Sequence, residues 1–216
     1  MEKRLPKSRS RAGRPTAEQA ELRHLELLDR ALDLFLKKGF ELTTLDAIAA
    51  AMHMTKRTIY GLYPNKEALF KAAVQRAIDA NLVSIEKLQA IETEDLETTL
   101  ISVARQRIEA FLSPTGIRLQ RVISAESYRF PEILTLAYKK GTKPVVDFLA
   151  DLFRRHTATG AIQVEKPETA AAVFLSMAVG GPARGMLAGA LPEESTNLDE
   201  HIKYCVKIFL DGMRHR

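Results

Sequence analysis

Lys56, Arg57 and Lys66 lie in a stretch of the chain, residues 47–66, that contains no Asp or Glu. Ammonium and guanidinium groups attract phosphate, and a guanidinium can also donate two hydrogen bonds to the edge of a guanine. Side chains with hydroxyl groups lie among the same cations. The stretch therefore predicts a uniformly positive surface that attracts phosphate groups.

The residue patterns of common catalytic sites do not occur in this sequence. It has no GxSxG, HExxH, Walker or Gly-rich dinucleotide motif. His201 and Cys205 are four residues apart and could place two metal ligands side by side, but two ligands are half a site. Cys205, the only cysteine, is more simply interpreted as a small buried hydrophobe than as a metal or redox sensor. We expect no catalytic residues and no cofactor or metal; turnover of a bound small molecule would reveal the rival, a helical enzyme.

The elements that must position the cations are all helices. Apolar side chains recur every three or four residues, and no stretch alternates with the period of two that is typical of strands. The predicted fold class is all-α. In the first half of the chain we expect helices over residues 17–38, from 43 or 44 to 52, 55–64 and 65–91. In the second half we expect helices over residues 96–113, 117–129, 131–158 with a kink between Gly141 and Pro144, 167–190 and 198–213.

Two of these expected helices are short, flank a tight turn near His53, and carry the cations on the second. A helix is about 10–12 Å wide and the major groove of DNA about 12 Å, so an exposed cationic helix can enter the groove. The arrangement predicts a helix-turn-helix, whose first helix braces the second. The alternative is an ordinary helical hairpin within a bundle. Tyr60 is likewise a DNA contact, a core aromatic, or both, since its ring is apolar and its hydroxyl polar.

Three segments, Thr43–Ala49, Met54–Tyr60 and Tyr63–Leu69, resemble the N-terminal domain of TetR-family transcriptional regulators. The resemblance extends over about residues 20–72. It implies a three-helix DNA-binding domain with a helix-turn-helix, which we place at residues 16–66.

The resemblance also implies roles for individual residues. Thr44 and Lys66 would bind phosphates at helix N-termini, and Arg57 would read a base edge from the start of the recognition helix. His53 stands where the family usually has Gly, in a turn that favours left-handed backbone, so we expect some strain there. The predicted DNA-binding residues are Thr43, Thr44, Thr55, Lys56, Arg57, Thr58, Tyr60, Tyr63 and Lys66.

Residues 1–15 are expected to form a disordered basic arm. Six cations against one Glu in residues 1–14 carry all of the formal net charge of +5. Such a segment buries too little apolar surface to offset its ordering entropy until it meets a polyanion. The alternatives are a solubilising tail or, for the whole protein, a helical interaction or membrane-surface adaptor whose arm binds anionic lipid. Without a signal-peptide pattern or a membrane-spanning apolar run, we expect a cytoplasmic protein with no membrane partner.

Residues 67–216 are expected to form a helical ligand-binding and dimerisation domain. The segment Arg121–Glu132 resembles the regulatory domain of AefR-like members of the TetR family. Its polar residues, with Arg118, fall on nearby turns, where they either line a pocket or form surface pairs. The predicted lining of a largely apolar pocket for an unidentified small-molecule effector is Phe111, Arg118, Arg121, Tyr128, Phe148, Phe174 and Met177.

Small residues between Ala170 and Gly185 would let another helix approach closely. TetR-like regulators pair through their last two helices, which the resemblance places at residues 167–190 and 198–214. The alternative is a core within one chain. The predicted homodimer interface contains Phe174, Gly181, Arg184, Cys205 and Phe209. Together these features predict a ligand-responsive regulator, a repressor that its effector releases from a palindromic operator in double-stranded DNA.

Overall fold

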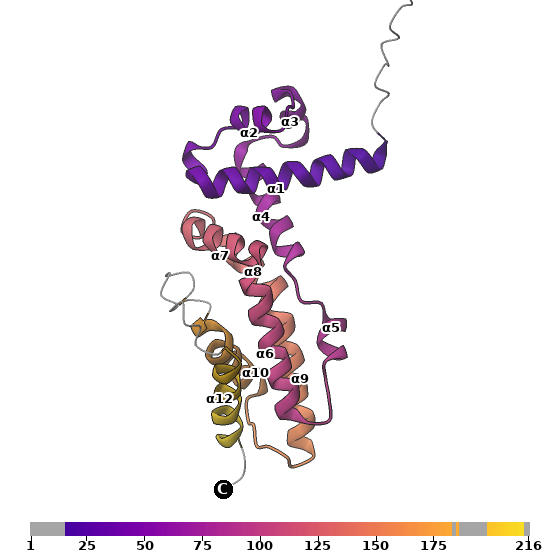
Figure 1. The fold of residues 1–216 in the computed structure, drawn as a ribbon, viewed down its shortest axis with the longest axis vertical. Coiled ribbons are helices and arrows are strands. Elements are labelled where there is room, and N and C mark those ends of the chain that lie inside the picture. Colours follow the sequence, from indigo (N-terminus) through magenta and orange to yellow (C-terminus); the bar gives the residue numbers. More distant parts are fainter. Residues whose placement is uncertain (1–15, 183–184, 186–197, 214–216) are drawn as a thin grey trace, which may run out of the picture.

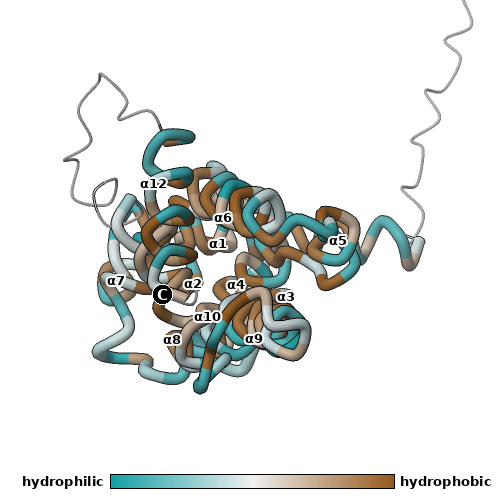
Figure 2. Tube along the Cα trace, turned by 90° about the horizontal axis from the view of Figure 1, so that it is seen from below, coloured by the Kyte–Doolittle hydropathy of each residue, from teal (hydrophilic) through white to brown (hydrophobic). Residues whose placement is uncertain are grey.

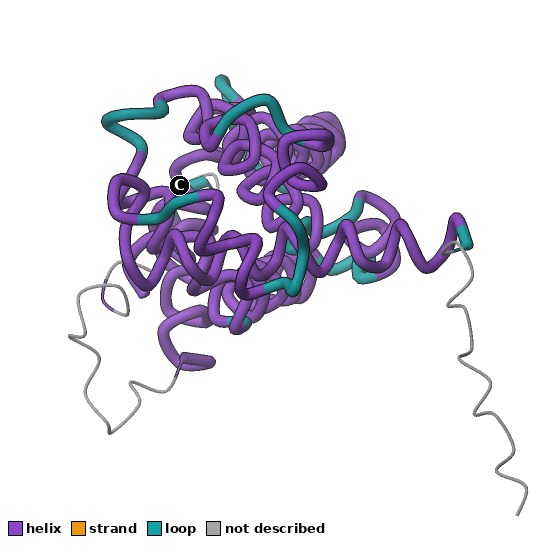
Figure 3. The backbone as a smooth tube through the Cα atoms, turned by 90° about the horizontal axis from the view of Figure 1, so that it is seen from above, coloured by secondary structure: helices purple, strands orange, loops and turns teal. Residues whose placement is uncertain are grey.

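The computed structural model describes residues 16–182, 185 and 198–213. Every regular element within these ranges is a helix, so the all-α prediction is confirmed (Figure 3). None of the described helices is both long enough and apolar enough to cross a membrane. The predicted basic arm, residues 1–15, and Arg184 of the predicted dimer interface lie outside the described residues.

The first half of the chain contains α1 (Ala17–Leu42), α2 (Leu45–Ala51), α3 (Lys56–Leu62), α4 (Lys66–Ala80), α5 (Ile85–Ala90) and α6 (Leu96–Leu112). The second half contains α7 (Pro114–Glu126), α8 (Pro131–Ala137), η1 (Tyr138–Thr142), α9 (Lys143–Ala158), α10 (Pro167–Leu175), η2 (Ser176–Gly180) and α12 (Leu198–Asp211), where η denotes a π-helical segment. Figure 1 shows a head made of α1 to α3, a body made of α6, α9, α10 and α12, and α7 and α8 between them. Apolar and polar stretches alternate along the helices (Figure 2), as expected where each helix buries one face.

Local sequence explains where the helices of the head begin and end. A capping box starts α1, with the Thr16 hydroxyl accepting from the Gln19 amide and the Gln19 side chain accepting from the Thr16 amide. Gly39, with φ 79°, interrupts the helical backbone of α1 next to the predicted end at residue 38. Thr44 and Thr55 are the N-caps of α2 and α3. The two short helices predicted around the turn are therefore present.

The helix predicted over residues 65–91 is wrong as a single element. The structure ends α4 at Ala80 and begins α5 at Ile85. Asn81 is the C-cap of α4, and the Ser84 hydroxyl accepts a hydrogen bond from the amide of Lys87 to cap α5. Short polar side chains of this kind compete with the helical hydrogen bonds of the backbone, which explains the interruption.

The helical path predicted over residues 131–158 continues without a break, and η1 widens it where the kink between Gly141 and Pro144 was predicted. This wide turn joins α8 to α9. Proline has no N–H to donate to the preceding turn, which favours such a local widening. A second π-helical segment, η2, likewise ends shortly before Pro182.

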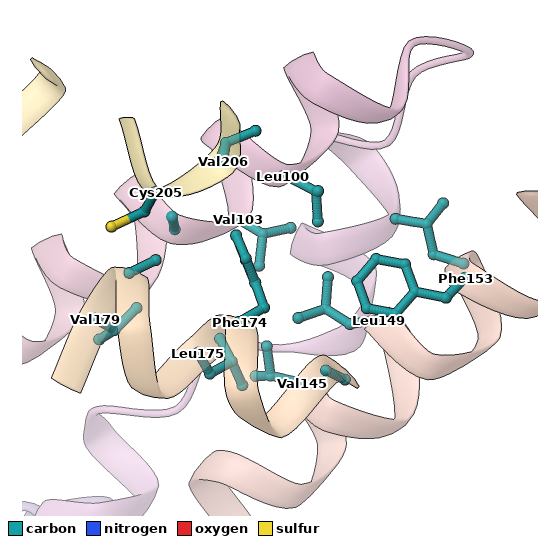
Figure 4. Packing of buried hydrophobic residues seen from close by; sticks show 14 of the residues in the cluster. Leu100, Val103, Val145, Leu149, Phe153, Phe174, Leu175, Val179, Cys205 and Val206 are labelled. Carbon is teal, nitrogen blue, oxygen red and sulfur yellow. The ribbon is translucent and has the colours of Figure 1, made fainter. Parts of the chain in front are cut away.

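The apolar core is divided into a head core and a body core. The body core joins α6, α9, α10 and α12 (Figure 4). The head core contains the buried faces of α1 to α4 and, in addition, Leu119, Val122, Ile123, Phe130 and Ile133. The Phe130 ring lies 4.9 Å between centroids from both Phe40 and Phe70. Therefore α7 and α8 are packed into the head, and the boundary predicted at residues 66 and 67 falls at the start of α4 within the head core.

Polar contacts surround the same junction. The Glu126 carboxylate accepts a hydrogen bond from the backbone amide of Phe40 at 3.1 Å. The ion pairs between the head and the segment α7–α8 are Arg118–Asp33, Arg129–Glu41 and Lys71–Glu132. Exposed ion pairs stabilise a fold weakly, so the apolar contacts hold the junction together while the ion pairs favour one orientation.

Phe130→Ala is expected to lower the free energy of unfolding by about 3–5 kcal/mol, because it removes a buried ring from the head core. Tyr128→Ala is the matched control, since Tyr128 is fully exposed two residues away. The control is expected to change the free energy of unfolding by less than about 0.5 kcal/mol. Urea denaturation followed by circular dichroism measures both. Equal losses in the two variants would contradict the position of Phe130.

Candidate nucleic-acid interface

The turn between α2 and α3 has the left-handed backbone that the sequence predicts. His53 has φ 51° and is the only described non-glycine residue with a positive φ. The Met54 amide donates to the Ala49 carbonyl at 2.9 Å and closes the turn. A histidine in the left-handed region has a higher conformational energy than a glycine would have there, so the turn is strained as expected.

One face of α3 is anchored and the other is free. Ile59 is completely buried in the head core, and it fixes the rotation of this short helix. Lys56, Arg57 and Thr58 are all exposed. Tyr60 is also exposed, so its interpretation as a core aromatic is wrong. The helix thus presents a continuous row of polar and cationic side chains to solvent.

Thr43 is a correction to the predicted site. Its side chain is completely buried, and its hydroxyl lies 2.8 Å from the Gly39 carbonyl oxygen and 3.1 Å from that of Leu34. It therefore closes the end of α1 from inside and has no surface to offer DNA. Thr44 and Thr55 differ, because both are exposed caps whose hydroxyls accept backbone hydrogen bonds at 3.1 Å.

The surface around α3 is not uniformly positive, which is a second correction. Asp46, just outside the acid-free stretch of sequence, lies in the first turn of α2. Its carboxylate is 2.9 Å from the Lys56 ammonium. This hydrogen bond and the charge of Asp46 raise the pKa of Lys56 above its ordinary value. Arg57 has no ion pair with a described residue, so it is the freer of the two cations.

Lys66 has a structural partner that the sequence did not reveal. Its ammonium donates to the carbonyl oxygens of Phe40 at 2.8 Å and Glu41 at 3.1 Å, and it lies 4.4 Å from the centre of the Phe40 ring. Lys66 therefore connects the start of α4 to the end of α1. An ammonium has three donors, so one remains for a phosphate.

His24 was missed as part of the site. Its Nε2 is 2.6 Å from the Tyr63 hydroxyl, and the two rings stack with centroids 5.9 Å apart. Burial raises the pKa of Tyr63. The two residues are 39 positions apart, and no local pattern in the sequence connects them. His24 therefore holds the Tyr63 hydroxyl in place at the C-terminal end of α3.

Most of the predicted DNA-binding residues line two shallow hollows on the head, but Arg57 and Tyr63 line neither. Thr44, Lys56, Tyr60 and Lys66 line one hollow of about 380 Å³. Thr55 and Thr58 line the other, of about 400 Å³, together with His24 and His53. The N-caps of α2 and α3, Thr44 and Thr55, therefore each border a hollow on the surface of the head.

The structure does not bring the residues of the predicted effector pocket together around one cavity. Arg118 pairs with Asp33 of α1, and Arg121 and Tyr128 are exposed. Phe174 is fully buried in the body core, against which Phe148 and Met177 pack. Of the predicted residues only Phe111 lines the cavity of about 230 Å³ that lies at the junction of head and body.

Arg107 lines that cavity and was missed as a site residue. The sequence signal was a charged residue on the apolar stripe of α6, one turn from Val103 on one side and Phe111 on the other. An arginine in this position needs a partner of opposite charge or a hydrogen-bond acceptor, since burying an unpaired charge costs free energy.

The predicted dimer residues are also corrected. Phe174 points into the body core (Figure 4), and Cys205 is buried at the edge of that core, where its thiol contacts the Met177 carbonyl oxygen at 3.7 Å. Phe209 packs on Phe153 and Phe174 within the same chain. Gly181 is exposed. The alternative interpretation, a core within one chain, therefore holds for Phe174, Cys205 and Phe209.

The fold and this site define a class of protein, DNA-binding regulators with a helix-turn-helix head on a helical body. Residues 27–73 match "Bacterial regulatory proteins, tetR family". Residues 98–212, more than half of the chain, match "AefR-like transcriptional repressor, C-terminal domain". The chain belongs to the tetR family of bacterial regulatory proteins, and both resemblances in the sequence are confirmed.

Curated relatives share part of their length with this chain. The DNA-binding transcriptional repressor TetR of Mycobacteroides abscessus is 34% identical over 100 residues, which are 45% of this chain and 50% of the relative. The HTH-type transcriptional repressor ComR of Escherichia coli is 34% identical over 73 residues, 34% of this chain and 35% of the relative. The chain spans half or less of the length of these two relatives.

Solved structures resemble the chain over nearly its whole length. The Flavonoid-responsive Regulator FrrA is 28% identical, with a TM-score of 0.68 over 90% of this chain and 98% of the other. A TetR family transcriptional regulator from Pseudomonas syringae is 18% identical, with a TM-score of 0.68 over 94% of this chain and 100% of the other. The second likeness, at low identity, supports the fold alone.

Proposed function

We propose that this protein is a repressor that binds a palindromic DNA operator as a homodimer and leaves it when a small-molecule effector binds. The observation that carries the proposal is the exposed cationic face of α3, held outward by the buried Ile59 in a helix-turn-helix. The relatives named above are described as repressors, and the neighbour FrrA is described as responsive to a flavonoid. Proteins of the tetR family bind operator DNA as dimers.

In this proposal α3 is the recognition helix. Arg57 reads a base edge in the major groove, and Lys56, Thr58 and Tyr60 lie beside it. Thr44, Thr55, Tyr63 and Lys66 approach the phosphates from the flanking helix ends. The basic arm adds phosphate contacts that are not specific for sequence.

The homodimer follows from the length of the recognition helix and from the surface of the body. One short helix reads few base pairs, whereas two related helices read half-sites about 34 Å apart. Helices α10 and α12 leave apolar side chains exposed, namely Val173 on α10 and Tyr204 and Ile208 on α12. We assign the dimer interface to this face, together with Gly181 from the original prediction, in place of Phe174, Cys205 and Phe209.

The effector acts through the junction of head and body. A ligand changes DNA affinity only by as much as it prefers one arrangement of the heads over another. The cavity at the junction is bounded by residues of the head core and by residues of α6, so an occupant can have such a preference. We propose no catalytic step for this site.

Arg57→Ala is expected to cost about 1–3 kcal/mol of operator binding and to relax the preference at one base pair, because it removes the base-reading guanidinium. Lys87→Ala on α5 is the control, since it removes an exposed cation from the body and should leave operator binding unchanged. Selection from random DNA duplexes defines the operator, and titration of the labelled operator measures both variants. Full affinity and unchanged base preference in Arg57→Ala would rule out α3 as the recognition helix in this orientation.

Ile208→Glu is expected to convert the dimer to a folded monomer that loses operator binding, because an unpaired carboxylate would be buried between the chains. Leu22→Glu on α1 places the same charge at an exposed apolar position in the head and is the control. Sedimentation equilibrium measures the assembly state and circular dichroism the fold. A dimeric Ile208→Glu variant, or a monomeric wild type bound to one half-site, would exclude this interface.

A further inference from the structure

The cavity of about 230 Å³ lies where the head meets the body. Its walls come from the end of α4, the second half of α6, α7, and the junction of α8 with η1. The larger apolar side chains that line it are Ile78, Leu82, Phe111, Leu119, Ile123 and Leu134. An apolar cavity of about 150 Å³ can hold a benzene ring, so this one has room for a substituted ring.

Arg107 is the only charged residue among the described residues that line the cavity. It has no ion pair or hydrogen bond with another described residue. Burial lowers the pKa of its guanidinium from the ordinary value. Since arginine stays charged at neutral pH, the cavity contains a positive charge that has no counterion among the described residues.

Four other arginines at or near this junction are paired, and Arg121 of α7, which has no ion pair with a described residue either, is exposed to solvent, whereas Arg107 is partly buried. The four ion pairs are Arg76–Asp29, Arg118–Asp33, Arg129–Glu41 and Arg105–Asp199. Arg105 is two residues from Arg107 on the same helix, but it faces outward and meets its carboxylate at 3.0 Å. Salt bridges within the protein therefore account for the positions of these four arginines. No such pair with a described residue accounts for the position of Arg107.

The remaining polar groups of the lining can orient a bound anion. Gln120 and Thr142 both line the cavity and carry hydrogen-bond donors. Leu134 and Tyr138 line it as well and are each about half exposed, so the entrance lies beside α8 and η1. The cavity thus combines an apolar wall, an uncompensated cation and access from solvent.

We propose that this cavity binds a monocyclic aromatic carboxylate, with its ring against the apolar wall and its carboxylate paired with the Arg107 guanidinium. A guanidinium matches a carboxylate with two parallel hydrogen bonds, which favours this anion over a neutral ligand of the same shape. The inference rests on the proposed function, because it gives the chemical class of the effector.

The position of the cavity connects this ligand to the head. Ile78, Leu119 and Ile123 belong both to the cavity wall and to the head core. Phe111 belongs to the wall and packs against the body core. A bound ring therefore contacts both cores at once, and it favours the arrangement of head and body that accommodates it.

Calorimetric titration of the full-length protein with 4-ethylbenzoate and with 4-ethylbenzamide, its neutral isostere, tests the assignment. We expect the acid to bind the wild type and Arg107→Gln to weaken it by about 10- to 100-fold, the usual effect of a charge-assisted hydrogen bond. The amide should bind both proteins weakly and about equally. Arg105→Gln, which removes a paired arginine from the same helix, is the matched control and should bind the acid as the wild type does.

Thermal unfolding separates a ligand-binding arginine from a structural one. Removing an uncompensated charge from the cavity should leave the melting temperature of ligand-free Arg107→Gln unchanged or raise it. A lower melting temperature, together with no difference between acid and amide, would assign Arg107 a structural role and overturn the proposal. Failure of the acid to bind the wild type at millimolar concentration, or equal binding by Arg107→Gln, would overturn it too.

Operator release distinguishes this inference from the proposed function. Arg107-dependent binding of the acid with unchanged operator affinity supports the anion site and contradicts effector-controlled repression. Conversely, release of the operator by 4-ethylbenzamide and 4-ethylbenzoate alike, in the wild type and in Arg107→Gln, would support effector control and overturn the anion site.

Discussion

The contact of the Phe130 ring with Phe40 and Phe70 is the interaction on which the rest of this structure depends. It places the start of α8 inside the head core, while the same helical path continues through η1 into α9 and the body core. Aromatic side chains bury a large apolar area and pack with defined geometry, so this contact fixes an orientation as well as stabilising it. The head is therefore joined to the body by α7 and α8 as well as by α4.

This double connection explains how a change in the body can reach the DNA. If the connection were α4 alone, its end at Ala80 and the non-helical residues before α5 would let the head turn freely. With α7 and α8 packed against α1 and α4, the head follows the part of the body that borders the cavity. In a dimer, that movement would change the distance between two recognition helices, which the spacing of half-sites must match.

Features of the structure that depend on local sequence could be predicted, and features that depend on contacts between distant residues could not. Caps, apolar spacing and the turn at His53 are local, so the helix-turn-helix followed from the sequence. Burial of Thr43 and the contact of His24 with Tyr63 are set by tertiary packing, which spacing does not contain. Phe174 and Cys205 illustrate the same limit, because an apolar stripe is equally suited to a core and to an interface.

Native-state hydrogen exchange of the full-length protein, without DNA or ligand, tests most directly whether α7 and α8 belong to the head. Backbone amides that share one packed unit open with one free energy, whereas separate units open with different ones. We predict that amides of α7 exchange with the same opening free energy as those of α1 and α4, and that Phe130→Ala lowers all three together. Exchange of α7 in step with α12, unaffected by Phe130→Ala, would contradict the account.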